Sequence, residues 1–261
     1  MSHLLRRTLL ALAAVAATGL LAAPAQARSL DDIRKDGKIV VATEGAFAPF
    51  NFFEGKKLSG YEVELAEAVV KQMGLKIEWK TIGFDALLAG LQQDKWDLVI
   101  ASHGINEERA KAVTFAEPHY CTGGVIVSKE GKLKTAADLA GKVVAVQVGT
   151  SYMENVKKVA GVKEVKTFPK DPEVMAALAA GRVDAAVSDK FTVREALGSK
   201  ALAKANLKIG DFLFVEQVAA AVAKGNTGLA GAFNTALKAL QGDGTVAKIS
   251  QKYFKEDVTC K

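Results

Sequence analysis

The sequence is short of the residues that most catalytic and metal centres need. Its 261 residues include only 2 cysteines, 3 histidines and 5 prolines. His103 and His119, the two histidines outside the N-terminal segment, have no cysteine or acid at the spacing of metal ligands, so we expect no metal site. A Walker-type phosphate loop, a G-x-G-x-x-G after the first expected strand and a nucleophile elbow are also absent, and we therefore expect no cofactor.

Clusters of basic charge are missing as well. The chain has 35 Lys and Arg against 29 Asp and Glu, but the basic residues are spread along it and are not interleaved with aromatics. This distribution gives no support to nucleic-acid binding.

The N-terminal residues 1–27 have the pattern of a signal peptide. Arg6 and Arg7 precede an apolar run over 8–21, and Ala25-Gln26-Ala27 fits an A-x-A cleavage site. The apolar run is short for a transmembrane helix. No cysteine lies near the cleavage point, which argues against a lipid anchor. We expect export to the periplasm, cleavage after about Ala27 and no membrane span in the mature chain. The paired arginines leave a twin-arginine route open.

Both cysteines, Cys121 and Cys260, lie in the exported part of the chain. In an oxidising compartment a lone pair of cysteines favours a disulfide, which here would tie the end of the chain to its middle. Two separate buried thiols are the alternative.

The remainder of the chain repeats one design in two halves. Apolar strand runs alternate with amphipathic helices, which indicates an α/β fold with a mainly parallel sheet in each half. In the first half we expect strands at 38–43, 75–80 and 97–101 and helices at 61–73 and 84–93. In the second half we expect strands at 142–146, 165–168 and 184–187 and helices at 152–159 and 172–180. Ligands of such sheets bind beyond the carboxyl ends of the strands.

Two extended segments, 121–129 and 216–224, are expected to cross between two lobes. The first lobe would then comprise 28–120 and also 217–261, which holds the return strand and two C-terminal helices. The second lobe would comprise 121–216. The loops at the strand ends of both lobes would face each other across one cleft.

The stretch 97–120 holds the strongest candidate for a ligand site. A short apolar strand leads into Ser102-His103-Gly104, where small residues let a ligand approach the backbone. Asn106 is suited to cap a short helix that would carry Arg109 in its first turn. A guanidinium held there can bind a carboxylate with two parallel hydrogen bonds. The alternative is a solvated arginine on a surface loop.

The letters around Arg109, IASHGINEERAKAVTFAEPHY, resemble the signature T-x-E-R-x-x-x-V-x-F-S-x-P-Y of periplasmic solute-binding proteins of polar amino-acid ABC importers, bacterial solute-binding protein family 3. The sequence departs from it at Asn106, where threonine is usual, and at His103-Gly104, where small hydroxyl residues are common. Further motifs follow in the order of the family, at 48–51, 60–66, 149–151, 181–185 and 243–245. The resemblance implies a type II periplasmic binding fold with two lobes and a two-strand hinge.

The resemblance also implies how an amino acid would be held. In the family, the arginine that matches Arg109 binds the α-carboxylate, and the aspartate that matches Asp189 binds the ammonium group. Ser102, His103 and Gly104 would form the loop beside the ligand. The N–H groups of Thr150 and Ser151 would add donors to the carboxylate. For Asp189, Thr150 and Ser151 the alternative is plain helix capping, which Asp189 can combine with binding.

Three further residues match positions that contact the ligand side chain in the family. Phe47 and Phe84 match aromatics that sandwich it, and their alternative is ordinary core packing. Glu44 matches an acid in relatives that bind lysine, arginine or histidine, and its alternative is an exposed turn acid. His103 can hydrogen-bond a ligand or cap its neighbours.

These features predict the substrate-binding subunit of an ABC importer. We expect it to be a monomer that captures an L-amino acid, cationic or polar, by closure of its lobes and delivers it to an inner-membrane permease with its ATPase. The alternative is an enzyme on the same scaffold, resembling exported cyclohexadienyl or arogenate dehydratases. Such an enzyme needs a general acid, for which Glu44 and His103 are the candidates.

Overall fold

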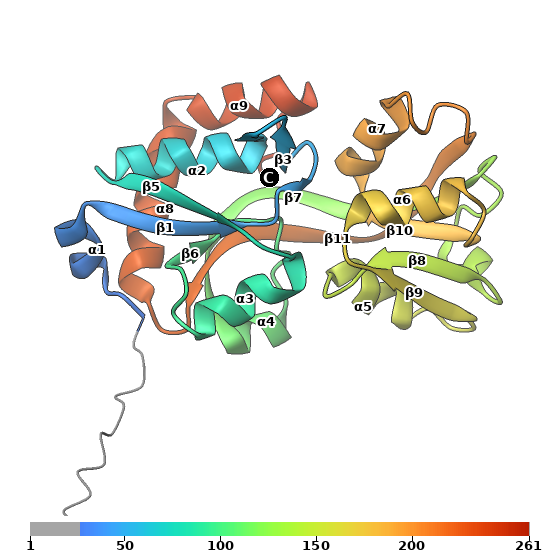
Figure 1. Ribbon diagram of the computed structural model, residues 1–261, viewed down its shortest axis with the longest axis horizontal. Coiled ribbons are helices and arrows are strands. Elements are labelled where there is room, and N and C mark those ends of the chain that lie inside the picture. The colour runs from blue at the N-terminus through green and yellow to red at the C-terminus, as the bar shows by residue number, and fades with distance from the viewer. Residues whose placement is uncertain (1–26, 261) are drawn as a thin grey trace, which may run out of the picture.

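A computed structural model describes residues 27–260 and shows two lobes side by side (Figure 1). The predicted signal peptide, 1–27, lies outside the described residues except for Ala27. Within the described part of the chain, no helix has both the length and the apolar character needed to cross a membrane.

One eight-stranded sheet runs through both lobes, in the order β5-β1-β6-β11-β7-β10-β8-β9. In the first lobe, the parallel strands are β1 (Lys38–Thr43), β5 (Lys76–Thr81) and β6 (Leu98–Val99). In the second lobe, they are β8 (Val143–Gln147), β9 (Glu164–Phe168) and β10 (Ala185–Asp189). The mixed α/β architecture with a mainly parallel central sheet is the one expected from the alternating sequence pattern.

Helices cover the faces of this sheet (Figure 1). The first lobe carries α1 (Leu30–Asp36), α2 (Tyr61–Gln72), α3 (Phe84–Gln92), α4 (Glu107–Ala112), α8 (Thr227–Gly242) and α9 (Thr245–Phe254). The second lobe carries α5 (Ser151–Lys157), α6 (Asp171–Ala179) and α7 (Lys190–Gly198), and a 3-10 turn, Ala136–Leu139, precedes β8. A small antiparallel sheet of β2 (Ala46–Phe47), β3 (Asn51–Glu54) and β4 (Lys57–Ser59) follows β1.

Two long antiparallel strands connect the lobes (Figure 1). They are β7 (Val113–Lys129) and β11 (Leu207–Ala223), which pair along their whole length with several register shifts. Both are longer than the expected crossings, 121–129 and 216–224. The predicted lobe boundaries therefore fall inside continuous strands. Because β7 and β11 belong to the same sheet as the parallel strands, the hinge is continuous with the sheets of both lobes.

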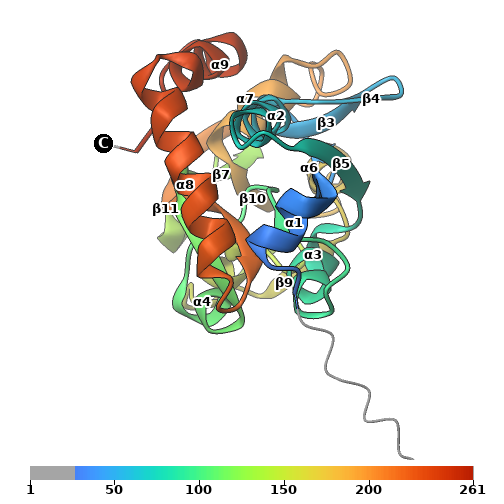
Figure 2. The same ribbon diagram turned by 90° about the vertical axis from the view of Figure 1, so that its left-hand side faces the viewer.

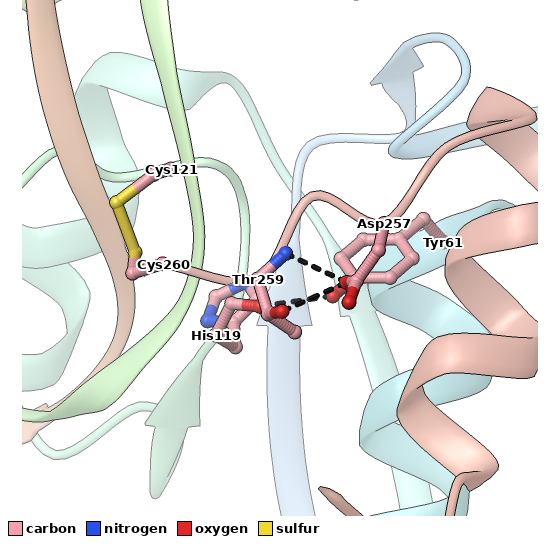
Figure 3. The surroundings of a disulfide bond; sticks show 6 residues. All are labelled: Tyr61, His119, Cys121, Asp257, Thr259 and Cys260. Carbon is pink, nitrogen blue, oxygen red and sulfur yellow. Dashed lines mark hydrogen bonds between the residues drawn. A yellow bond between two sulfur atoms is a disulfide. The ribbon is translucent and has the colours of Figure 1, made fainter.

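The C-terminal helices return to the first lobe. Both α8 and α9 contact α2 (Figure 2), and Phe233 and Leu237 of α8 are buried in the core. The end of the chain then reaches β7, where Cys260 is bonded to Cys121 (Figure 3). Their Cα atoms are 4.9 Å apart, and the amide of Cys121 donates to the carbonyl of Val258 at 2.9 Å.

The disulfide is thus present as the cysteine pattern predicted, and the alternative of two buried thiols is wrong. It joins residues separated by 139 positions. By the chain-entropy model, a loop of that size contributes up to about 5 kcal/mol to the free energy of unfolding. The bond fixes the C-terminal tail next to the hinge strand.

Candidate functional site

Arg109 lies between the lobes. The Asn106 side chain caps α4 by accepting from the Arg109 amide at 2.8 Å, which places the arginine in the first turn as expected. Its guanidinium donates to the Gly104 carbonyl at 2.8 Å and to the Gly149 carbonyl of the second lobe at 3.0 Å. Only 8% of the residue is exposed, and burial lowers the pKa of the guanidinium. The alternative of a solvated surface arginine is therefore wrong.

The loop before Arg109 is hydrogen-bonded to Glu62, which the sequence patterns did not single out as a site residue. Ser102 has a left-handed backbone, φ 57°, and its amide and hydroxyl donate to the Glu62 carboxylate at 2.8 and 2.9 Å. Asn51 Nδ2 and His119 Nε2 also contact this carboxylate, at 2.9 and 3.0 Å. The Ser102 hydroxyl thus already donates its hydrogen to a fully buried carboxylate of the protein.

His103 stacks on Phe84. The two rings are nearly parallel, with an interplanar angle of 12° and centroids 4.3 Å apart. Burial, and then the charge of Arg109, lower the pKa of His103 well below its usual value, so the imidazole is neutral. Its Nδ1 atom is buried and has no hydrogen-bond partner within residues 27–260. The arrangement makes one aromatic wall from α3 and the loop.

Glu44 and Gln147 meet across the lobes. Gln147 Nε2 donates to Glu44 Oε1 at 2.7 Å and also contacts the Pro169 carbonyl at 3.1 Å. Glu44 is 8% exposed, so the alternative of an exposed turn acid is wrong. Burial raises the pKa of Glu44 to about 7, against a smaller opposite effect of the Gln147 hydrogen bond. The sequence patterns did not single out Gln147, since it is the last residue of an apolar strand.

A narrow cavity lies between the lobes. The residues that line it are Glu44, Phe47, Phe84, Ser102, Gln147, Thr150, Ser151 and Tyr152. Six of the predicted site residues thus come together, with Gln147 and Tyr152 added. The other four predicted residues, His103, Gly104, Arg109 and Asp189, do not line it in this conformation. Hydrogen bonds across the cleft, including one from Asn106 to Glu154 at 3.2 Å, indicate that the lobes are closed.

Thr150 and Asp189 both cap helices. Thr150 Oγ1 accepts from the Met153 amide at 3.2 Å at the start of α5. Asp189 ends β10 and caps α7, accepting from the amides of Phe191 and Thr192 at 2.7 and 3.2 Å. The other carboxylate oxygen of Asp189 accepts from the Thr122 hydroxyl. Burial is the main reason that the pKa of Asp189 rises to about 6. The capping interpretation is correct for both residues, and it leaves a binding role open.

The chain is similar to known proteins along most of its length. The family model of the bacterial extracellular solute-binding proteins, family 3, matches residues 39–256. The L-cystine-binding protein TcyJ of Escherichia coli (strain K12) is 33% identical over 265 residues, and the alignment covers 99% of each chain.

Solved structures give the same picture. An ancestral arginine-binding protein bound to arginine superposes with a TM-score of 0.79 at 40% identity, covering 84% of this chain and 98% of that one. The ancestral amino-acid-binding protein AncCDT-1, a precursor of cyclohexadienyl dehydratase, superposes with a TM-score of 0.78 at 30% identity, covering 86% and 98%.

Proposed function

Because the chain belongs to the bacterial extracellular solute-binding proteins of family 3, we propose that it captures an L-amino acid between its lobes and delivers it to the permease and ATPase of an ABC importer. The N-terminal pattern of a signal peptide fits an exported, periplasmic protein. Relatives that bind cystine or arginine support an amino acid as the ligand.

One observation carries the proposal. Arg109 is buried between the lobes, and the hydrogen-bond partners of its guanidinium are two carbonyl oxygens. Among the described residues no carboxylate forms an ion pair with it, although a buried guanidinium is most stable when it is paired with an anion. The α-carboxylate of an amino acid fits this requirement, because it accepts two parallel hydrogen bonds from a guanidinium. Amide donors at Thr150 and Ser151 would complete its surroundings.

The remaining groups of the ligand have partners nearby. Asp189 would contact the ammonium group, and the loop Ser102-His103-Gly104 would border the backbone of the ligand. Phe47 and Phe84 line the cavity and would flank the side chain. Glu44 lies at the same cavity, where a buried carboxylate favours a cationic side chain and repels an acidic one.

Closure follows from this division of partners. Arg109 and Glu44 belong to the first lobe, whereas Asp189 and Gln147 belong to the second. A zwitterionic ligand satisfies both sets only when the lobes are together, so it shifts the population towards the closed state. That state would be the one presented to the permease.

A thermal-shift series tests the proposal. The protein is unfolded and refolded to remove bound ligand, then heated with each L-amino acid and with ornithine, citrulline, prephenate or arogenate. A ligand at 100 times its Kd stabilises the native state by about 2.7 kcal/mol, so the true ligand raises the midpoint visibly. A flat response to every amino acid would overturn the proposal.

The variant Glu44→Gln tests the selectivity. We expect the affinity for L-arginine and L-lysine to fall by about 10- to 100-fold, because a charged hydrogen bond is lost from a buried site. The affinity for L-glutamine should change little, which provides the control. Equal losses for cationic and neutral ligands would show that Glu44 acts only through the structure of the cleft.

A dehydratase is the second candidate, favoured by the likeness to AncCDT-1 and by Glu44. A carboxyl group with a pKa of about 7 is suited to donate a proton at neutral pH. His103 is less suited, since it is neutral and stacked against Phe84. Turnover of prephenate or arogenate by the purified protein, lost in Glu44→Gln, would establish the enzyme.

A further inference from the structure

Glu216 is a half-buried acid at the hinge that the proposed function does not yet use. It lies on β11 opposite Thr122 of β7, where the two strands cross between the lobes. Its Oε1 atom is buried and has no hydrogen-bond partner in the described part of the chain. A buried acceptor without a donor is costly, which suggests that the donor comes from outside the protein.

Gly104 makes room for this carboxylate. A Cβ atom added to Gly104 would lie 1.7 Å from Glu216 Oε2, so any other residue there would displace the glutamate. Gly104 also forms an isolated β-bridge with Val218, which lies two residues after Glu216 on β11. The absence of a side chain at Gly104 therefore leaves the Glu216 carboxylate its place.

The charges around Glu216 come from three other elements. They are Arg109 of α4, Glu154 of α5 and Asp189 of β10, and the Ser151 hydroxyl of α5 is also close. After burial and the charge of Asp189, the charge of Glu216 also raises the pKa of the Tyr152 phenol. Burial raises the pKa of Glu216 to about 7, the Ser151 hydroxyl and Arg109 oppose this rise, and Asp189 adds to it. Two further acids, Asp189 and Glu154, thus lie near the Glu216 carboxylate, together with one guanidinium, that of Arg109.

Asp189 alone is poorly equipped to hold an ammonium group. Its carboxylate already accepts two amide hydrogens at one oxygen and the Thr122 hydroxyl at the other. An ammonium group brings three N–H donors. Three of the four acceptor sites of the Asp189 carboxylate are thus occupied, whereas Glu216 Oε1 has no donor in the described part of the chain. Glu216 also lies close enough to both Asp189 and Arg109 to interact with their charges.

We propose that Glu216 is a ligand-binding residue that, together with Asp189, contacts the α-ammonium group of the captured amino acid. The inference rests on the proposed function. It places the carboxylate of the ligand at Arg109 and its ammonium group between two acids, one from the second lobe and one from the hinge. A ligand without an α-amino group would leave both acids without their cation.

The experiment compares Glu216→Gln with Asp211→Asn, a matched control that removes an exposed carboxylate from the same strand. Binding is measured by calorimetry for L-arginine and for 5-guanidinopentanoate, which lacks only the α-amino group. If another L-amino acid binds more tightly in the thermal-shift series, it and its own deamino acid are the probes.

We expect Glu216→Gln to weaken L-arginine binding by about 10- to 100-fold, as for loss of a charged hydrogen bond. Binding of 5-guanidinopentanoate should stay within about twofold of the wild type, and Asp211→Asn should change neither. Equal losses for both probes would reduce Glu216 to a structural role and overturn the inference. Unchanged L-arginine binding would overturn it too, while the proposed function would stand. Failure of the wild type to bind any L-amino acid would refute the proposed function itself.

Discussion

Two glutamates near the cleft, the buried Glu62 and the half-buried Glu216, have opposite surroundings. The Glu62 carboxylate accepts from or contacts four polar groups, at 2.8 to 3.0 Å, from Ser102, Asn51 and His119. Glu216 has a buried oxygen without any donor in the part of the chain that the structure describes. Burial is therefore a poor guide to function by itself. The informative difference is whether the protein satisfies the carboxylate or leaves that to a ligand.

The largest expected effect comes from breaking the satisfied network. Glu62→Gln presents amide hydrogens to groups that now donate, so buried donors lose their acceptor. We expect the free energy of unfolding to fall by about 3 kcal/mol. Urea unfolding measures this fall, and Glu67→Gln on the exposed face of the same helix is the control. A loss below about 1 kcal/mol would mean that the network contributes little to stability.

A smaller effect is expected from Gly104→Ala, which acts on the unsatisfied glutamate. The added Cβ atom displaces the end of the flexible Glu216 side chain. The affinity for the amino acid should fall by about tenfold, as for loss of one charged hydrogen bond, with little change in unfolding. In the double variant with Glu216→Gln the losses in affinity should not add, because both changes remove the same interaction between Glu216 and the ligand. Fully additive losses would separate Gly104 from Glu216.

A further effect concerns pH. Burial raises the pKa of Glu44 and Glu216 to about 7 and of Asp171 and Asp189 to about 6. The folded protein thus holds these protons more tightly than the unfolded chain, whose carboxyls titrate near pH 4. Their contribution to stability is complete below about pH 4 and is lost as the pH rises through about 6 to 7.

Scanning calorimetry of the ligand-free protein between pH 5 and 8 tests this sign. We expect the unfolding midpoint to fall by about 2 to 4 °C for each kcal/mol lost. Saturating L-arginine should reduce the fall, since a bound cation favours the ionised carboxylates. A midpoint that rises over this range would show that other groups dominate the titration.

Much of the fold could be predicted from local patterns. The helix expected at 61–73 is α2, Tyr61–Gln72, and Asn106 caps α4 as its position suggested. The small sheet of β2, β3 and β4 was not among the expected elements, because its strands are too short to show a period of alternation. The hinge strands are also longer than expected, because pairing along the neighbouring strand, and not the composition of either segment, sets their ends.

The site shows the same division. Arg109, Glu44 and Phe47 could be named as candidates because family-like motifs include them or lie within a few residues of them, and Phe84 because it matches a family position. Gln147 and Glu216 could not, because each meets its partner across a long stretch of chain: Gln147 lies 103 residues from Glu44, and Glu216 comes from the return strand.

By itself, the sequence determined the alternation of strands and helices, the pairing expected of two exported cysteines and the family-like stretch around Arg109. These depend on side-chain periodicity, redox chemistry and short motifs, all of which are local. Only the tertiary structure decided that Arg109 reaches a carbonyl of the other lobe, that Glu62 is satisfied and that Glu216 Oε1 finds no donor within residues 27–260. Hydrogen bonds and burial of that kind depend on which distant segments the sheet brings together.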